Sequence, residues 1–303
     1  MPRTFYGPHG ENNSTYASSG NANVGRFPLG HVLVLPDDRR YRFVLNDGTA
    51  EIAANLYQAV ASVAGHTNIK ANLARAIGAT TISGTLNTTL AAIDIYAEGI
   101  VHSNDDVGEG YSHRITRAMS AGAAHAAAVA TGVLTVNLVA GESVQVALTT
   151  ASDISFSRNK GHQVLIHPSP PTGNLVGVSP GVAAADRFYW SQFEGYAAVL
   201  AQGTLLAGLP VQASTTVDGA VESVKRRIQI STTGSVLTAG TTFRAEVVDQ
   251  DGSVTALFMA VSVSTTTVFD ASGGIANNSP IVGRCVKANA DTEEGLIDLQ
   301  LCL

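Results

Sequence analysis

The pentapeptide GVSPG at residues 177–181 has the G-x-S-x-G spacing of a nucleophilic serine turn, with Ser179 as its serine. Such a turn stabilises the developing oxyanion with the backbone N–H of the residue that follows the serine. Here that residue is Pro180, which has no backbone N–H. The turn should also lead into a helix, whereas small residues and a strand-like segment follow. We therefore expect no hydrolase activity, and the sequence assigns no catalytic residue.

The eight histidines are scattered along the chain. His162 and His167 flank the strand-like residues 163–166, and their odd spacing places them on opposite faces of a strand. A helical zinc site needs two histidines on one face. His102 and His113 could approach each other across a hairpin, where a surface pair is favoured over a metal site. No metal ligand is assigned.

The acidic segment NDDVGEGYSHRI at residues 104–115 could suggest a calcium loop. It lacks the Asp-x-Asp-x-Asp register and the closing bidentate glutamate of such loops. The pattern favours a solvated hairpin turn followed by a strand at residues 111–115. The chain also lacks the glycine-rich motifs that bind nucleotide phosphates, so we expect no cofactor.

Composition indicates a sheet protein covered by partners rather than a metabolic enzyme. Of the 303 residues, 45% are hydrophobic but only 14% are charged, against about 25% in ordinary soluble domains. A net charge of −6 argues against nucleic-acid binding by the whole chain. We find neither a signal peptide nor an apolar run of membrane-spanning length, and expect a soluble, reducing compartment without membrane contact. Cys285 and Cys302 are expected to be buried free thiols, although a pair stays possible.

Residues 188–211, FYWSQFEGYAAVLAQGTLLAGLPV, are the stretch around which the other elements should be arranged. Their aromatic residues alternate, and Gly195, Gly203 and Gly208 predict turns between three short strands. This β-meander should bury one face of Trp190's strand in the subunit and pack the other at a subunit boundary.

Strand-like segments recur every 8–12 residues, the spacing of a sandwich or barrel. We predict an all-β fold with two sandwich- or barrel-like domains at residues 26–170 and 171–303, divided by the proline-rich residues 167–180. The second domain should be a meander of β-clip type with an inserted β region at residues 228–278. Residues 1–25 should be an extended arm, either disordered or ordered on a neighbouring subunit. Residues 118–131 could form a short helix or a loop.

The basic run KRR at residues 225–227 is either a solvated strand entry or the site of a salt bridge to an acidic neighbouring subunit. With the aromatic anchors of the arm and the single tryptophan, it completes the set of candidate interface residues: Phe5, Tyr6, Trp190, Lys225, Arg226 and Arg227.

The segments GRFPLGHVLVLPDDRRYRFVLNDGTA, IYAEGIVHSNDDVGEGYSHRI, FYWSQFEGYAAVLAQGTLLAGLPV and PIVGRCVKANADTEEGLIDLQL resemble a family of virion structural proteins of tailed bacteriophages. The resemblance covers most of residues 25–225 and 280–303. Members of that family are encoded beside the major capsid protein and are regarded as capsid cement or decoration proteins. The resemblance implies an all-β homotrimer that binds the major capsid protein on the outside of an icosahedral head and stabilises contacts between capsomers.

Other classes of function stay open. A phage tail fibre or receptor-binding subunit shares the β-rich, Gly/Thr-rich composition and is the main alternative. A carbohydrate-active enzyme would need two carboxylates about 5–10 Å apart. A major capsid protein is disfavoured because the chain lacks a long amphipathic helix.

Overall fold

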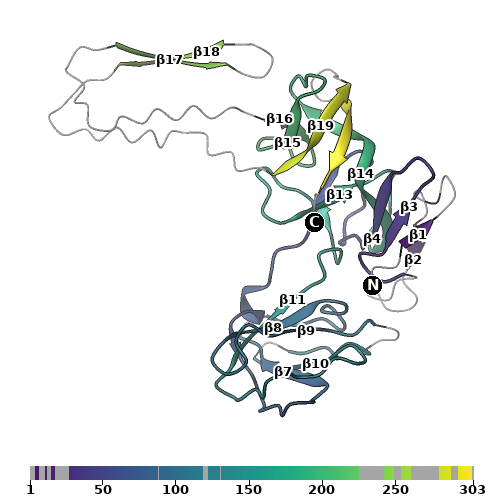
Figure 1. Ribbon diagram of the computed structural model, residues 1–303, viewed down its shortest axis with the longest axis vertical. Helices are drawn as coiled ribbons and strands as arrows, with labels where there is room; N and C mark the ends of the chain where they lie inside the picture. The colour runs from purple at the N-terminus through teal and green to yellow at the C-terminus, as the bar shows by residue number, and fades with distance from the viewer. Residues whose placement is uncertain are drawn as a thin grey trace.

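The computed structural model describes residues 4–6, 11, 15–17, 27–87, 89–118, 122–129, 131–224, 242–248, 254–260, 280–287 and 293–301. Strands and turns make up these residues, together with short 3-10 turns such as Ala64–His66. The predicted all-β class is confirmed. Figure 1 shows two lobes, one built around β14 and the other containing β7 to β11.

The longest strand, β14 (Arg187–Gln202), organises the larger lobe. Its first half pairs antiparallel with β4 (Arg40–Leu45), and its second half pairs antiparallel with β20 (Glu294–Gln300). The remaining strands of this 12-stranded sheet extend it on either side of β14; they include β3 (Val32–Val34), β5 (Leu56–Gln58), β12 (Leu165–Ile166) and β13 (Leu175–Val178).

The segment predicted as a three-strand meander differs from that prediction at Gly195. This residue does not turn the chain but lies inside β14 with φ +87°, just after a bulge where pairing passes from β4 to β20. A bulge bends a strand without ending its ladder, so β14 can serve two neighbours in succession. Gly203 and Gly208 do adopt left-handed φ angles of +72° and +82°, and β15 (Pro210–Ala213) follows the second of them.

Five strands of the larger lobe close into a small barrel. β14, β20, β19 (Ile281–Lys287), β15 and β16 (Val221–Ser223) pair in succession, and β16 returns to β14 through a parallel pairing. Val199, Val211 and Ile297 are among the side chains that fill the core cluster associated with these strands. Closure satisfies the backbone hydrogen bonds that an open edge would leave unpaired.

Residues 69–157 close into a second barrel. β6 (Ile69–Lys70), β11 (Asp153–Ser157), β8 (Ile100–Asp105) and β9 (Ser112–Arg114) pair in that order, and β7 (Thr81–Thr85) pairs with β10 (Val133–Asn137). Single bridges from Ala71 to Gly84 and from Ile115 to Leu138 join these two sheets into a ring. A side chain at Gly84 would lie 2.9 Å from the Ile69 Cδ1 atom, so glycine permits this close packing of the wall on the core.

The domain boundary expected at residue 170 does not separate two sheets. β4 and β5 precede it and β13 and β14 follow it, yet all four belong to the 12-stranded sheet. The unit with a core of its own is instead the barrel at residues 69–157, inserted between β5 and β12. The glycines near residue 170 mark close packing rather than a linker, because a Cβ at Gly173 would lie 2.4 Å from the Ala59 carbonyl oxygen.

The described parts of the N-terminal arm lie on their own subunit. β1 (Thr4–Tyr6) runs parallel to β3, and β2 (Tyr16–Ala17) pairs antiparallel with the start of β14. The Tyr16 ring lies 5.6 Å from that of Phe43 and 6.1 Å from that of Phe27. Where the arm is described, it packs against the aromatic cluster beneath β4 and β14 of its own chain, and its order on a neighbouring subunit stays a prediction.

The alternation predicted for the aromatic strand is present, but both of its faces are buried within the subunit. Trp190 is fully buried, with its ring 5.0 Å from that of Phe43 and 5.4 Å from that of Phe27. Tyr189 points to a different core cluster, which includes Val44. Trp190 is therefore a core residue in this subunit, and its predicted place at a subunit boundary is wrong.

The Ala/Gly-rich residues 118–131 form turns where they are described, not a helix. The buried carboxylate of Asp94 holds this loop, accepting backbone N–H hydrogen bonds from Gly122 (2.6 Å), Ala124 (2.9 Å) and His125 (3.1 Å). Hydrogen bonds to the Asp94 carboxylate thus hold this segment in place. A helix would instead have needed an apolar stripe to pack against the core, and the segment has none.

The inserted region contains an antiparallel hairpin of β17 (Thr242–Val248) and β18 (Val254–Ala260). β16 before the insertion and β19 after it both pair with β15. The two ends of the insertion therefore leave the barrel two strand positions apart, roughly 10 Å.

Candidate functional site

Ser179 is not arranged as a nucleophile. Its side chain is buried, and its hydroxyl donates a 2.6 Å hydrogen bond to the Gly181 carbonyl oxygen. The pentapeptide therefore serves as a turn after β13. Absence of hydrolase activity stays a prediction, and this geometry supports it.

His167, one of the described histidines, is held by backbone carbonyl groups in the core. The His167 ring makes 2.8 and 2.9 Å contacts with the carbonyl oxygens of Ala220 and Pro168. His102 pairs in register with Ser112, whereas His113 pairs with Val101, so the two histidines are not direct cross-strand partners. Residues 104–115 form the β8–β9 hairpin as predicted. Within the described residues, no group of three or more His, Cys, Asp or Glu side chains could hold a metal ion.

The candidate interface residues do not come together. Tyr6 is 78% exposed at the end of β1, while Trp190 is in the core. The backbone of Phe5 lies in β1, paired with Leu33. Lys225, Arg226, Arg227 and Cys302 lie outside the described residues, and Cys285 is a buried free thiol whose pKa is raised by burial.

A groove of about 560 Å³ opens where β14 bends. It is lined by the turn before β4, by the residues around the Gly195 bulge and by the end of β20: Asp37, Asp38, Arg39, Glu194, Gly195, Tyr196, Asp298, Leu299 and Gln300. A side chain at Gly195 would lie 3.1 Å from the Arg39 Cγ atom, so the bulge brings the strand close to the β3–β4 turn.

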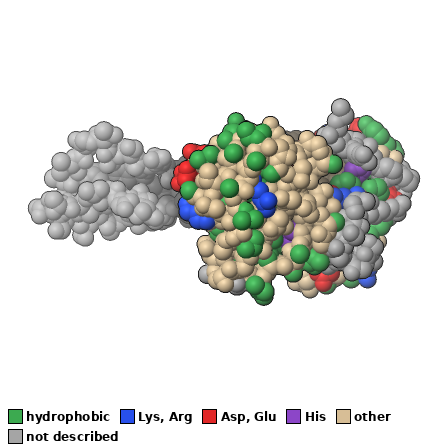
Figure 2. All heavy atoms as spheres, turned by 90° about the horizontal axis from the view of Figure 1, so that it is seen from below, with side chains coloured by type: hydrophobic (Ala, Val, Ile, Leu, Met, Phe, Trp, Pro, Cys, Tyr) green, Lys and Arg blue, Asp and Glu red, His purple; other side chains and the backbone are tan. Residues whose placement is uncertain are grey.

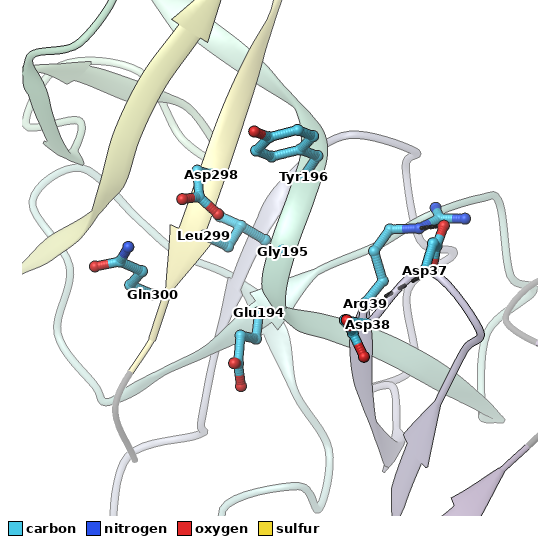
Figure 3. A pocket seen from close by; sticks show the side chains of 9 residues that line it. All are labelled: Asp37, Asp38, Arg39, Glu194, Gly195, Tyr196, Asp298, Leu299 and Gln300. Carbon is cyan, nitrogen blue, oxygen red and sulfur yellow. Dashed lines mark hydrogen bonds and ion pairs between the residues drawn. The ribbon is translucent and has the colours of Figure 1, made fainter.

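Two acidic groups of this groove, Asp37 and Glu194, are ion-pair partners. Asp37 accepts a 2.7 Å hydrogen bond from Arg39 Nε; burial opposes ionisation of Asp37, but the bonds and charge of Arg39 outweigh it and lower the pKa of Asp37. Glu194 lies 3.2 Å from Arg40 Nη1. Figure 3 shows the carboxylates of Asp37, Glu194 and Asp298 pointing away from one another. Glycoside hydrolysis needs two carboxylates that converge on one bond, and this groove does not supply them.

A buried carboxylic acid, Glu51, lies elsewhere in the larger lobe. Glu51 is 2% exposed, and its Oε2 atom has no hydrogen-bond partner among the described residues. Burial raises its pKa to about 8; the tyrosine hydroxyls of Tyr57 and Tyr189 oppose the shift, and the charge of Asp47 adds to it. Glu51 is therefore largely protonated at neutral pH, and its burial gives a substrate no access to it.

The barrel at residues 69–157 has a surface with few charged side chains. Residues 76–93 and 118–141 contain no Lys, Arg, Asp or Glu, and they meet through the β7–β10 ladder and the bridge between Ala91 and Ala128. Figure 2, which views this end of the molecule, shows hydrophobic and other uncharged side chains over most of its area and few charged ones. Five large apolar side chains in these segments are exposed, and four of them, all but Ile77, form what we call the neutral face: Leu90, Ile93, Val129 and Val133.

Comparison of the chain with protein-family models, curated proteins and solved structures finds no match. Among the described residues, no helix has both the length and the apolar character needed to cross a bilayer.

Sequence reasoning missed the neutral face, although its signal is present as two long runs without charged residues. It could not find the groove, because the groove's three walls come from segments more than a hundred residues apart.

Proposed function

We propose that this protein is a virion structural protein, a cement or decoration subunit that binds the outside of an icosahedral phage head as a homotrimer and stabilises contacts between capsomers. The observation that carries the proposal is the neutral face, an exposed apolar surface on a closed all-β barrel. Soluble monomers rarely expose contiguous apolar surface without a partner to cover it. The sequence resemblance supplies the identity of the assembly.

The architecture supports this role in a second way. Closing both barrels leaves no free strand edge within either barrel, where an edge could pair indiscriminately with other sheets. On the barrels, side-chain surfaces are what is left for attachment, and such surfaces can be specific. Because these surfaces carry little charge, binding to the head should weaken little as salt rises.

The copy number per particle tests the proposal. Quantitative mass spectrometry of purified virions should find hundreds of copies, and the purified protein should bind heads that lack it at both low and high salt. A few copies located at the tail would contradict the proposal and favour the tail-fibre alternative. Failure to bind any head would also contradict it.

A test for hydrolase activity accompanies this one. An ester substrate should not be turned over by the purified protein. Turnover that Ser179→Ala abolishes would establish an enzyme instead.

A further inference from the structure

The groove where β14 bends has one wall built from two cross-strand pairs. In the antiparallel ladder between β14 and β20, Tyr196 lies opposite Asp298, and Glu194 lies opposite Gln300. Directly opposed residues in such a ladder have Cβ atoms about 4.5–5.5 Å apart. Figure 3 shows the Tyr196 ring beside the Asp298 side chain of the neighbouring strand. Tyr196 is 58% exposed, so the wall offers an aromatic surface next to a carboxylate.

Part of the charge in this groove is already neutralised. Asp37 lies 2.7 Å from Arg39 Nε, and Glu194 lies 3.2 Å from Arg40 Nη1. Other polar groups of the groove are not engaged within the part of the chain that the structure describes. There, the side chains of Asp298 and Gln300 and the hydroxyl of Tyr196 make no hydrogen bond. These groups are the ones that a ligand in the groove would meet.

The lining of the groove selects the chemical class of that ligand. Four carboxylates against the single guanidinium of Arg39 disfavour an anion. Leu299 is buried, so the groove gives an apolar molecule little surface to contact. No three His, Cys, Asp or Glu side chains of the described residues form a metal site. A strongly basic peptide needs free carboxylates, yet two of the four are already paired with arginines.

A neutral saccharide matches the groups that remain. Sugar hydroxyls can donate hydrogen bonds to the Asp298 carboxylate and can both donate to and accept from the Gln300 amide. The apolar C–H face of a sugar ring can lie on the aromatic face of Tyr196. The groove volume of about 560 Å³ falls within the range of about 300–1,000 Å³ found for small-molecule sites.

We propose that the groove where β14 bends binds a neutral saccharide. Tyr196 is the surface on which a sugar ring stacks, and Asp298 and Gln300 are the groups that hydrogen-bond its hydroxyls. The saccharide is bound without being cleaved, because the carboxylates of the groove do not converge on one bond. This binding activity goes beyond the proposed function and does not depend on it.

Saturation-transfer-difference NMR on the purified full-length protein tests the proposal. The probes are neutral trisaccharides built from glucose, galactose, mannose or N-acetylglucosamine, and a polylysine peptide serves as the charged comparison. Tyr196→Ala removes the stacking surface, Tyr196→Phe keeps it, and Asp298→Ala removes a hydrogen-bond acceptor. The matched controls are Tyr111→Ala, at a 44% exposed tyrosine of the other barrel, and the exposed Glu109→Ala. Thermal unfolding checks that each variant is folded.

The wild type should bind at least one of the trisaccharides. Tyr196→Ala and Asp298→Ala should each weaken that binding at least about tenfold, whereas Tyr196→Phe and both controls should bind as the wild type does. The affinity should stay the same from low to high salt, because a neutral ligand carries no charge to be screened.

A wild type that binds none of the trisaccharides would overturn the proposal. So would binding that folded Tyr196→Ala protein retains, or an equal loss in Tyr111→Ala. Polylysine binding that Tyr196→Ala and Asp298→Ala abolish, in a protein that binds no saccharide, would assign the groove to basic peptides instead. Because no phage head enters this experiment, its failure leaves the proposed function standing, and failure to bind heads leaves the saccharide site standing.

Discussion

Glu51 is the residue whose protonation couples most directly to folding. Its pKa of about 8 in the folded protein compares with about 4.5 for an ordinary glutamate. Between these values the folded state holds a proton that the unfolded state releases. The proton on Glu51 therefore contributes its full amount to the free energy of unfolding below about pH 4.5. This contribution is lost as pH rises through about 8.

Glu51→Gln should remove this dependence, because the amide stays neutral at every pH. The free energy of unfolding of the variant relative to the wild type should increase from pH 5 to pH 9 by roughly 2–5 kcal/mol. Urea unfolding at both pH values measures it, with the exposed Glu109→Gln as control. A constant difference between wild type and Glu51→Gln would show that Glu51 is not protonated in the folded state.

Asp94 is a second residue whose side chain holds the protein together locally, because it organises the irregular loop at residues 122–125. Its two carboxylate oxygens together accept three backbone N–H groups. In Asp94→Asn an amide NH₂ replaces one oxygen and faces these donors, which should destabilise the protein by roughly 1–3 kcal/mol.

Asp38→Asn is the matched control for Asp94→Asn. Asp38 also has a left-handed φ, of 64° against 55° for Asp94, but it is exposed. Chemical denaturation of both variants should show a loss at Asp94 only. If Asp94→Asn and Asp38→Asn are equally stable, the loop at residues 118–131 does not depend on the Asp94 carboxylate.

At the scale of elements, β14 joins the open part of the large sheet to the five-stranded barrel. Gly195 permits this because its φ of +87° is one that other residues adopt only with strain, and because Arg39 packs against it. Gly195→Ala should therefore destabilise the larger lobe by roughly 1–3 kcal/mol.

Gly181→Ala provides the comparison for Gly195→Ala, because a Cβ there would meet no heavy atom within 4 Å. Its melting temperature should stay close to that of the wild type, while that of Gly195→Ala falls. If Gly195→Ala melts like the wild type, the strand can cross from β4 to β20 without the left-handed residue.

At the scale of the whole molecule, the N-terminal segment completes the core of the larger lobe. Its Tyr16 packs on Phe43 and Phe27, the same rings that contact Trp190. Deleting residues 1–17 should thus lower stability and admit water to Trp190, in addition to any loss of head binding.

Fluorescence reports this deletion directly, since Trp190 is the single tryptophan. Its emission should shift to longer wavelength and the melting temperature should fall, whereas deleting residues 1–3, ahead of β1, should change neither. Unchanged emission and melting after removal of residues 1–17 would show that β1 and β2 do not cover the cluster.

The sequence by itself determined the fold class and several strands, because these depend on local chemistry. The local pattern predicted a hairpin turn followed by a strand at residues 111–115, and the structure has β9 (Ser112–Arg114) there. The prediction that Ser179 is not a nucleophile rests on Pro180 and needs no tertiary context. A local pattern fails where packing decides: the proline-rich residues 167–180 were predicted as a domain boundary, yet strands on both sides of them belong to one sheet.

Tertiary structure alone decided which strands meet and which surfaces result. Gly195 is a typical turn residue, yet β4 and β20 lie in succession along β14 and keep the chain extended through it. Likewise, Leu90 and Val129 become one surface only through the bridge between Ala91 and Ala128. The physical reason is that the alternation of residues fixes which side chains share a face of each strand. Which other strand packs against that face depends on how the whole chain buries its apolar side chains.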